Sequence, residues 1–209
     1  MARARPAGLA IHRLTPRRME DMGKVLSGTW GNGCWCIFPR MTPAVERSLP
    51  GPGGAGEKRR REMTRLAKRR RAPGLLAYLD GEVAGWVAIA PRGELGRVDA
   101  SKATPRVDDV DVWVIPCITI RRKARGQGVA IALIQAAVRY AASQGAPAVE
   151  AYARAGTKRV HDDFAYYGTE GLFRRAGFKV IRKPLRGLPK GWTPRVTMRI
   201  DCNRKLFKV

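Results

Sequence analysis

The 209-residue sequence predicts a mixed α/β (α+β) fold in which strands and helices alternate. Short apolar runs with strand composition are interspersed with segments whose apolar residues recur every three to four positions. A second observation is the Asp80-Gly81 pair between two apolar runs, which is typical of a tight β-hairpin. The third is a strand, a glycine-containing turn and a helix in succession over residues 110–141. With 44% hydrophobic residues, the chain is long enough for one sizeable core, so we expect a single domain over residues 1–209.

The first elements follow from local signals. Leu9 to Leu14 has the composition of a short strand. Thr15-Pro16 then supplies an N-cap followed by proline at the first helical position, which predicts a helix over residues 16–26. Residues 27–56 are rich in glycine and proline and should form mostly loop, and the basic stretch that follows them reads as a helix.

Positive charge is the dominant feature of the composition. The chain has 41 Lys and Arg against 17 Asp and Glu, a formal charge of +24. The cations are concentrated in a basic loop and helix insertion around residues 40–72 and in a basic C-terminal segment over residues 182–209. Such a field attracts nucleic acid and other polyanions and disfavours polycationic substrates such as polyamines. The alternative is that the cations form a solvated surface with no specific partner.

The middle of the chain predicts the centre of the sheet. Leu75–Leu79 and Glu82–Ala90 flank the hairpin turn. Val110–Ile120 is a further strand by composition, but Pro116 inside it cannot donate a ladder hydrogen bond. We therefore expect the pairing of this strand to break or bulge at the proline.

Cysteine usage and hydropathy bear on the compartment. The cysteines do not form a disulfide framework or a zinc-binding pattern, so we expect no metal site. No apolar run approaches the roughly 20 residues of a membrane-spanning helix, and residues 1–10 lack the apolar stretch of a signal peptide. These observations favour a reducing, cytoplasmic location and no membrane partner. The four cysteines are Cys34, Cys36, Cys117 and Cys202.

The turn after residue 120 has the features of a phosphate-binding loop. The run Arg121 to Ala130 contains four cations and two glycines, and apolar residues from Val129 to Ala141 then predict a helix with one buried face. Unpaired backbone amides and the positive end of a helix converge at such a junction. The loop has neither the Gly-Lys-Ser/Thr ending of a nucleoside-triphosphate loop nor the third glycine of a dinucleotide fingerprint. A tight turn that binds nothing is the alternative.

The residues of this loop resemble the acyl-CoA pyrophosphate loop of the Gcn5-related N-acetyltransferase (GNAT) superfamily, written Arg/Gln-x-x-Gly-x-Gly/Ala. Arg125 to Ala130 fits every fixed position. Leu172 to Phe178 is similar to the late helix of that family, which ends in Gly-Phe, and the Cys-Trp-Cys segment within Gly33 to Arg40 resembles a bacterial subgroup. The resemblance extends from about Leu9 to Ile200.

This resemblance implies a fold and a cofactor. The fold is a mostly antiparallel central sheet with helices on both faces, in which two central strands splay apart; here they would be Val110–Ile120 and Ala148–Tyr152. The activity implied is an acetyl-CoA-dependent N-acetyltransferase in which a primary amine attacks the thioester directly. The residues expected to contact coenzyme A are Ile118, Thr119, Ile120, Arg125, Gly126, Gln127, Gly128, Val129, Ala130 and Phe173.

The resemblance is incomplete at the catalytic positions. It places an oxyanion-binding amide near Ile118, but the usual tyrosine acid is replaced by Phe173 and the usual carboxylate by Val114. Tyr166 or Tyr167 is therefore the candidate acid, unless these rings only pack. Glu150 and Asp111 are candidate bases acting through water, unless they are solvated strand residues.

The sequence does not identify the acceptor substrate. Cys34, Trp35 and Cys36 are expected either to line the acceptor side of the cleft or to plug the end of the sheet. One hypothesis is a small-molecule or peptide amine. A second is an amine carried by RNA, such as an aminoacyl-tRNA, contacted through the basic segments. A third is a non-catalytic acyl-CoA-binding protein.

Overall fold

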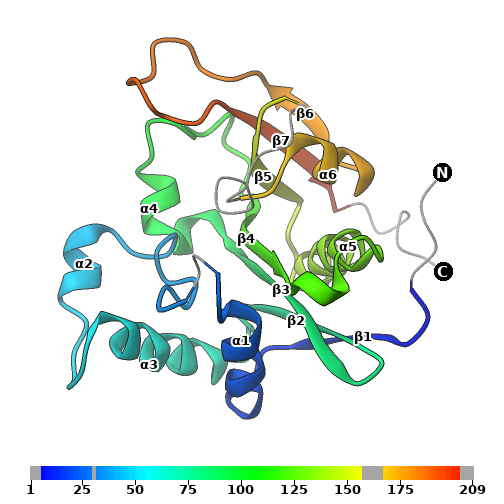
Figure 1. Ribbon diagram of the computed structural model, residues 1–209. Coiled ribbons are helices and arrows are strands. Elements are labelled where there is room, and N and C mark those ends of the chain that lie inside the picture. The colour runs from blue at the N-terminus through cyan, green and yellow to red at the C-terminus, as the bar shows by residue number, and fades with distance from the viewer. Residues whose placement is uncertain (1–5, 30–31, 157–166, 203–209) are drawn as a thin grey trace.

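The computed structural model describes residues 6–29, 32–156 and 167–202. Within these residues the strands form one sheet of seven, in the order β1-β2-β3-β4-β5-β7-β6, and every neighbouring pair except β4 and β5 is antiparallel. This arrangement confirms the predicted mixed, mostly antiparallel fold (Figure 1). The strands are β1 (Leu9–Arg13), β2 (Gly74–Leu79), β3 (Glu82–Pro91), β4 (Trp113–Ile120), β5 (Ala148–Arg154), β6 (Lys179–Arg182) and β7 (Arg195–Asp201).

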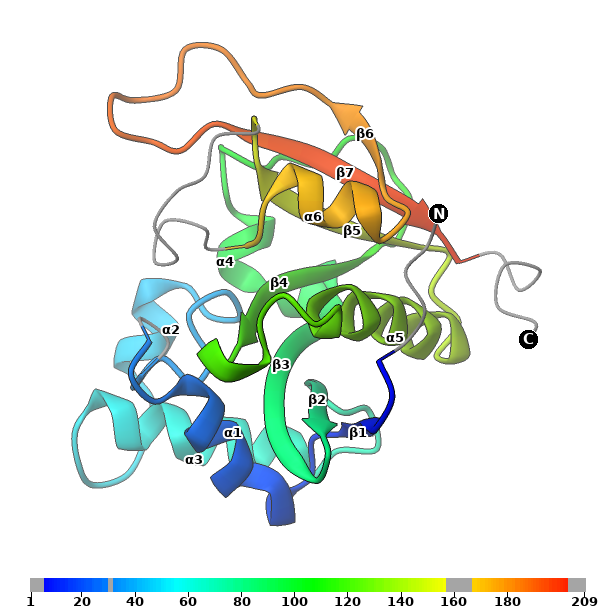
Figure 2. The ribbon, with the colours of Figure 1, turned by 45° about the vertical axis from the view of Figure 1, so that its right-hand side comes forward.

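Helices flank the sheet on both faces. The α-helices are α1 (Met19–Leu26), α2 (Pro43–Arg47), α3 (Ala55–Ala67), α4 (Gly96–Asp99), α5 (Val129–Ser143) and α6 (Glu170–Arg175), and the short 3₁₀ turns are η1 (Pro16–Arg18), η2 (Arg92–Glu94) and η3 (Arg122–Ala124). Figures 1 and 2 show α1 and α3 on one side of the sheet and α5 on the other. None of the helices in the described part of the chain is long and apolar enough to cross a bilayer.

The two faces of β3 pack into two different cores. Val87 and Ile89 belong to the core beneath α5, whereas Trp86 and Ala88 belong to the core beneath α1 and α3. Successive side chains on a strand point to opposite faces, so a strand buried on both faces reads as a continuous apolar run. Every residue of β3 from Val83 to Ala90 is indeed buried.

The hairpin forms as its turn residues predict. Asp80 and Gly81 have φ values of 51° and 82°, the positive dihedrals that a tight two-residue turn requires. The described residues of the loop predicted over 27–56 form no strand, and their helices are α2, whose Thr42 side chain caps the amide of Val45, and the start of α3 at Ala55. The basic stretch that follows is α3.

Pairing around β4 is irregular in two ways. The register against β3 shifts between Ala88 and Ala90, next to Pro116, and this confirms the predicted bulge. On its other side β4 pairs with β5 only at Trp113 and Val114, so the two strands diverge beyond that point. The predicted splay of the central strands is therefore present. The expected strand start at Val110 was wrong, because β4 begins at Trp113.

Candidate active site

The N-terminus of α5 presents unsatisfied amides. The helix begins at Val129, and its cap residue Gly128 has φ 82°, a conformation that glycine adopts without steric cost. The first amides of a helix have no partner inside the helix. Throughout the described residues, the amides of Gly128, Val129, Ala130 and Ile131 donate no hydrogen bond. Four donors at a positive helix end are suited to an anion.

A cavity of about 800 Å³ lies in front of these amides. One wall consists of Ile120 and the loop from Ala124 to Ala130. The facing wall comes from α6 and includes Arg174 and Arg175. Gln127 braces the loop instead of lining the cavity, because its side-chain amide donates to the carbonyl of Lys123 at 2.9 Å. The cavity thus combines backbone donors and guanidinium groups, a suitable environment for a diphosphate.

The backbone of β4 directs further polar groups toward the gap. The amide of Arg121 donates to the carbonyl of Ala84 at 2.9 Å. Because hydrogen-bonded and non-hydrogen-bonded pairs alternate along an antiparallel ladder, the pairs of Ile118 with Val87 and of Ile120 with Gly85 are of the non-hydrogen-bonded kind. The main-chain groups of Ile118 and Ile120 therefore face away from β3, into the opening between β4 and β5. Those of Thr119 pair with β3.

Glu150 lies on β5 within a buried network. Its side chain is 2% exposed, and Oε1 accepts hydrogen bonds from Nε and Nη2 of Arg199 at 3.0 and 2.7 Å. Oε2 accepts from the Tyr152 hydroxyl at 2.8 Å. Burial, and then the charge of Glu150, raise the pKa of Tyr152. These three hydrogen bonds favour a positioning role for the carboxylate, and its role as a base stays a prediction.

The network continues beyond the strands. Arg199 also pairs with Asp108 at 2.7 Å, and these hydrogen bonds raise the pKa of Arg199. The buried Arg92 donates to the Tyr152 hydroxyl and pairs with Asp99 at 2.9 Å. The network thus holds residues 92–112, which connect β3 to β4, against β5 and β7. The motifs in the sequence do not identify Arg92, Tyr152 or Arg199 as members of this network. The sequence does contain one indication of it, a lone Glu within the apolar strand 148–153, because a buried carboxylate needs a partner.

The aromatic candidates lie near the splay or within the core. Tyr167 is half-buried against the Val112 and Val114 cluster, has φ 71°, and lies with its ring 4.5 Å from the guanidinium of Arg195. Tyr166 lies outside the described residues. Phe173 is fully buried, with its ring edge-on to Phe178 at 5.1 Å, and belongs to the core rather than to the lining of the cavity.

The Cys-Trp-Cys segment lies on the sheet face opposite α5. Cys36 is buried, accepts a hydrogen bond from Nε1 of Trp86 at 3.2 Å, and contacts the Cys117 thiol of β4. The hydrogen bond with Cys117, together with burial, raises the pKa of Cys36 well above its ordinary value. Burial also raises the pKa of Cys34. All four cysteines are free thiols, and in the described residues no cluster of His, Cys, Asp and Glu is suited to hold a metal ion.

Fold and site together define a class of protein. A sheet opened at its centre, with free strand backbone beside an anion-binding helix end, suits an acyl-CoA-dependent transferase. The family model described as "Acetyltransferase (GNAT) family" matches residues 40–166, more than half of the chain. The chain belongs to the GNAT acetyltransferase family, and it is an acyltransferase that uses acetyl-CoA. The hypothesis of a non-catalytic acyl-CoA-binding protein is therefore set aside.

Solved structures show the same fold at low identity. Arylalkylamine N-acetyltransferase 2 from Aedes aegypti is similar at TM-score 0.56 and 15% identity, covering 93% of this chain and 99% of that one. Drosophila melanogaster polyamine N-acetyltransferase is similar at TM-score 0.56 and 11% identity, covering 92% and 99%. The putative acetyltransferase yncA of Salmonella typhimurium, solved with acetyl-CoA, has TM-score 0.53, 12% identity and coverage of 94% and 95%. No curated protein matches the chain.

Proposed function

We propose that the chain transfers an acetyl group from acetyl-CoA to an amine by direct attack of the amine on the thioester, in the opening between β4 and β5. The observation that carries this proposal is the divergence of these strands after Val114, which leaves the main chain of Ile118 and Ile120 facing the opening. Direct transfer forms a C–N bond and breaks the C–S bond. It needs one donor for the developing oxyanion and one proton for the departing thiolate.

Main-chain groups supply the binding of the donor in this proposal. The backbone of Ile118 and Ile120 pairs with the amide-containing arm of the cofactor as an added strand would. The amides of Gly128 to Ile131 hold the diphosphate, with Arg175 of α6 facing them across the cavity. The amide of Ile118 donates to the carbonyl oxygen of the thioester, where negative charge develops as the amine attacks.

Side chains supply the proton transfers. Tyr167 is the proposed acid for the thiolate, because it packs against the buried cluster that includes Val114, the last residue of β4 that pairs with β5. Glu150 is proposed to take, through water, the proton that the attacking amine loses, while Arg199 and Tyr152 hold its carboxylate in place. The Cys34 to Cys36 turn is proposed to border the acceptor, since Cys36 contacts Cys117, the residue next to Ile118.

A thiol-release screen tests the proposal. Purified protein is incubated with acetyl-CoA and chemically distinct amines, including arylalkylamines, peptide N-termini and polyamines, and free coenzyme A is measured. We expect acceptor-dependent release with at least one neutral or weakly basic amine. Release that requires no amine, or product acetylated at oxygen only, would contradict transfer to an amine.

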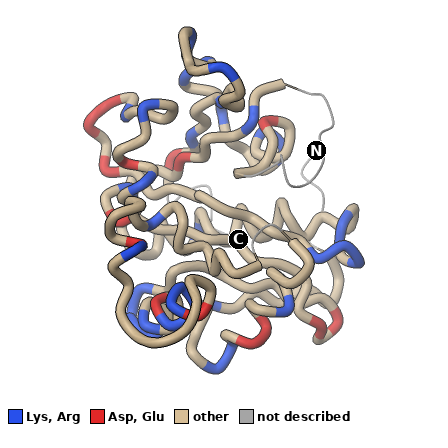
Figure 3. The backbone as a smooth tube through the Cα atoms, turned by 60° about the vertical axis from the view of Figure 1, so that its left-hand side comes forward, with Lys and Arg blue, Asp and Glu red and all other residues tan. Residues whose placement is uncertain are grey.

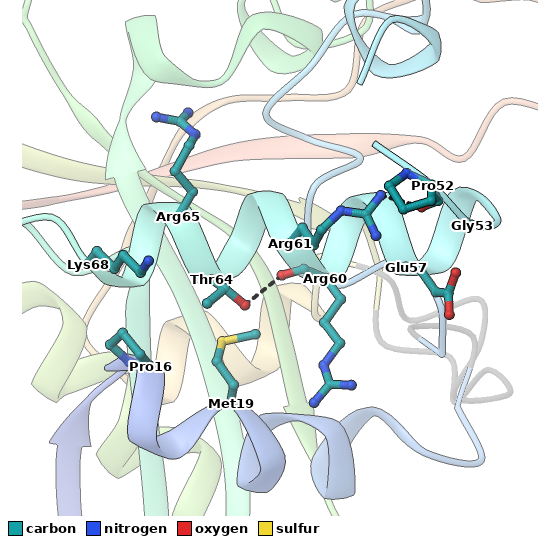
Figure 4. Close-up of a pocket in the computed structure, with 10 residues that line it drawn as sticks. All are labelled: Pro16, Met19, Pro52, Gly53, Glu57, Arg60, Arg61, Thr64, Arg65 and Lys68. Atoms are coloured by element: carbon teal, nitrogen blue, oxygen red, sulfur yellow. Dashed lines mark hydrogen bonds between the residues drawn. The ribbon is translucent and has the colours of Figure 1, made fainter. Parts of the chain in front are cut away.

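A second candidate acceptor is an amine carried by RNA. A groove of about 730 Å³ lies between α3 and the start of α1, and Figure 4 shows the residues that line it. Arg60, Arg61 and Lys68 contribute positive charge there, and the guanidinium of Arg60 lies 5.5 Å from the ring of Trp35. The turn from Cys34 to Cys36, which is proposed to border the acceptor, therefore lies beside a cationic groove. Such a groove favours a substrate attached to a phosphate backbone.

Salt dependence distinguishes the two acceptors. If the groove binds RNA, kcat/KM for an aminoacyl-tRNA falls steeply as salt rises, because phosphate contacts release counterions. The same amine without RNA shows little change. The variant Arg60→Gln with Lys68→Gln should reduce that slope, whereas Lys102→Gln with Lys179→Gln, which removes equal charge from exposed positions outside the groove and outside both basic segments, should not. Equal slopes for both double variants would contradict the RNA acceptor.

A further inference from the structure

Arg40 is a buried cation that the proposed reaction does not use. Its side chain is inside the protein, and the residue is 8% exposed. The backbone holds it in place, since its amide donates to Ile37 at 2.8 Å and its carbonyl accepts from Gly96 at 3.1 Å. One guanidinium nitrogen, Nη2, donates to the carbonyl of Pro73 at 2.8 Å. Arg40 therefore links the segment after the Cys-Trp-Cys turn to α4 and β2.

A second nitrogen of this guanidinium is unsatisfied. Nε is buried and has no hydrogen-bond partner among residues 6–29, 32–156 and 167–202. Within the same residues Arg40 makes no salt bridge. Burial lowers the pKa of Arg40 to about 10, so the group stays charged at neutral pH. A buried charge without a partner is strongly unfavourable, and native proteins rarely retain one without a counterion.

A cavity of about 80 Å³ adjoins Arg40. This exceeds the roughly 10–15 Å³ that one water molecule needs. Arg69 and Arg71, from the segment after α3, also line the cavity and are exposed, so they form its rim. Its one carboxylate, that of Glu94, is paired with Arg71 at 2.7 Å. Three arginines thus line a space whose one carboxylate is already paired with Arg71.

We propose that this pocket of Arg40, Arg69 and Arg71 binds a phosphate group, either as inorganic phosphate or as the monoester of a larger molecule. Guanidinium groups form paired hydrogen bonds with phosphate oxygens, and several are needed to balance a dianion. A phosphate here supplies the counterion that the Arg40 guanidinium lacks. The pocket is distinct from the α5 cavity, with which it shares no lining residue.

Nuclear magnetic resonance of arginine side chains tests this assignment at the residue concerned. Inorganic phosphate is titrated through the millimolar range into ¹⁵N-labelled full-length protein at constant ionic strength, and the Nε–H signal of Arg40 is followed. We expect a saturable shift of that signal. A parallel titration with phenyl phosphate determines the source of the group: a matching shift indicates that monoesters enter, and a shift with inorganic phosphate alone indicates a site for the free ion.

Two exposed variants provide the comparison. Arg69→Gln should weaken phosphate binding about tenfold, the effect of losing one charged hydrogen bond. Arg47→Gln removes the same charge from an exposed position of α2 that does not line the pocket, and should leave affinity unchanged. The proposal is overturned if the Arg40 signal does not respond to phosphate, which would mean that only water fills the cavity. It is also overturned if Arg69→Gln and Arg47→Gln bind phosphate equally well.

Discussion

Glu150 connects segments that are far apart in the sequence. Its carboxylate is shared by Arg199 of β7 and Tyr152 of β5, and Arg199 reaches on to Asp108. Removing one member of a buried ion pair leaves its partner with an unbalanced charge. The residue is therefore expected to contribute to stability whether or not it also moves a proton.

Replacing Glu150 by Gln separates these two roles. We expect Glu150→Gln to lower the free energy of unfolding by about 2 kcal/mol, because Arg199 keeps Asp108 but loses its buried partner. Urea denaturation measures this loss. If Glu150 is also a base, kcat at saturating acceptor falls as well. An unchanged unfolding midpoint would contradict the importance of the ion pair.

Tyr167 is tested by removing a single oxygen atom. Tyr167→Phe should lower kcat about 100-fold if its hydroxyl protonates the thiolate, with little change in the dissociation constant of coenzyme A. The packing against Val114 and the contact with Arg195 should survive, so the melting temperature serves as the control. An unchanged kcat would assign Tyr167 to packing alone.

At the scale of elements, the proposed donor site depends on the start of α5. Gly128→Leu should weaken coenzyme A binding about 10- to 100-fold, because a side chain at the helix cap keeps the diphosphate from the amides, each charged hydrogen bond contributing about 1.5–3 kcal/mol. Calorimetry measures the affinity. Gly145→Leu is the matched control, since Gly145 also has positive φ, 87°, but follows the other end of α5. Equal affinities in both variants would argue against binding of the diphosphate by the amides at the start of α5.

Structural features that depend on a single element could be predicted from the sequence. Asp80-Gly81 specified its hairpin, Pro116 the irregular pairing of β4, and Gly128 the cap of α5, because each depends on backbone dihedrals or a missing donor. Contacts between elements could not be predicted from the sequence. The meeting of Cys36 with Cys117, and the burial of Arg40 against Pro73, depend on how segments far apart in sequence pack together.

The same limit applies to the candidate site. The spacing of Arg125 to Ala130 predicts a pyrophosphate loop, and most of these residues line the cavity, whereas their contact with coenzyme A stays a prediction. Phe173 was placed against the cofactor by alignment with a tyrosine, yet an apolar ring at that position is buried with Phe178 instead. The partner of Glu150 could not be identified, because any of the 41 Lys and Arg residues might have served as its counterion.

For the whole molecule, positive charge extends beyond the two basic segments. Figure 3 shows Lys and Arg at many positions along the backbone, far more often than Asp and Glu. Excess positive charge repels itself in the compact state and attracts polyanions. The salt dependence of kcat/KM for an RNA-borne amine therefore has to be compared with that of control variants from which equal charge has been removed.

Stability should decline at alkaline pH. Burial, with the nearby Asp201 carboxylate, raises the pKa of Cys202 to about 11, and burial with the Asp21 hydrogen bond raises that of Tyr78 to about 12. Both groups hold protons that the unfolded chain releases, so their contribution is complete below the ordinary values and is lost as pH rises through about 9–12. Urea midpoints across this range measure the decline. The double variant Cys202→Ala with Tyr78→Phe should show a shallower decline, and an identical slope would contradict this origin.

The most direct test of the donor site is a titration of ¹⁵N-labelled protein with coenzyme A, followed through backbone amide shifts. If the main chain of β4 and the start of α5 hold the cofactor, the amide protons of Ile118, Gly128, Val129 and Ala130 move downfield and saturate together. If those four signals stay fixed while coenzyme A perturbs residues elsewhere, the cofactor binds at another place and the proposed mechanism fails.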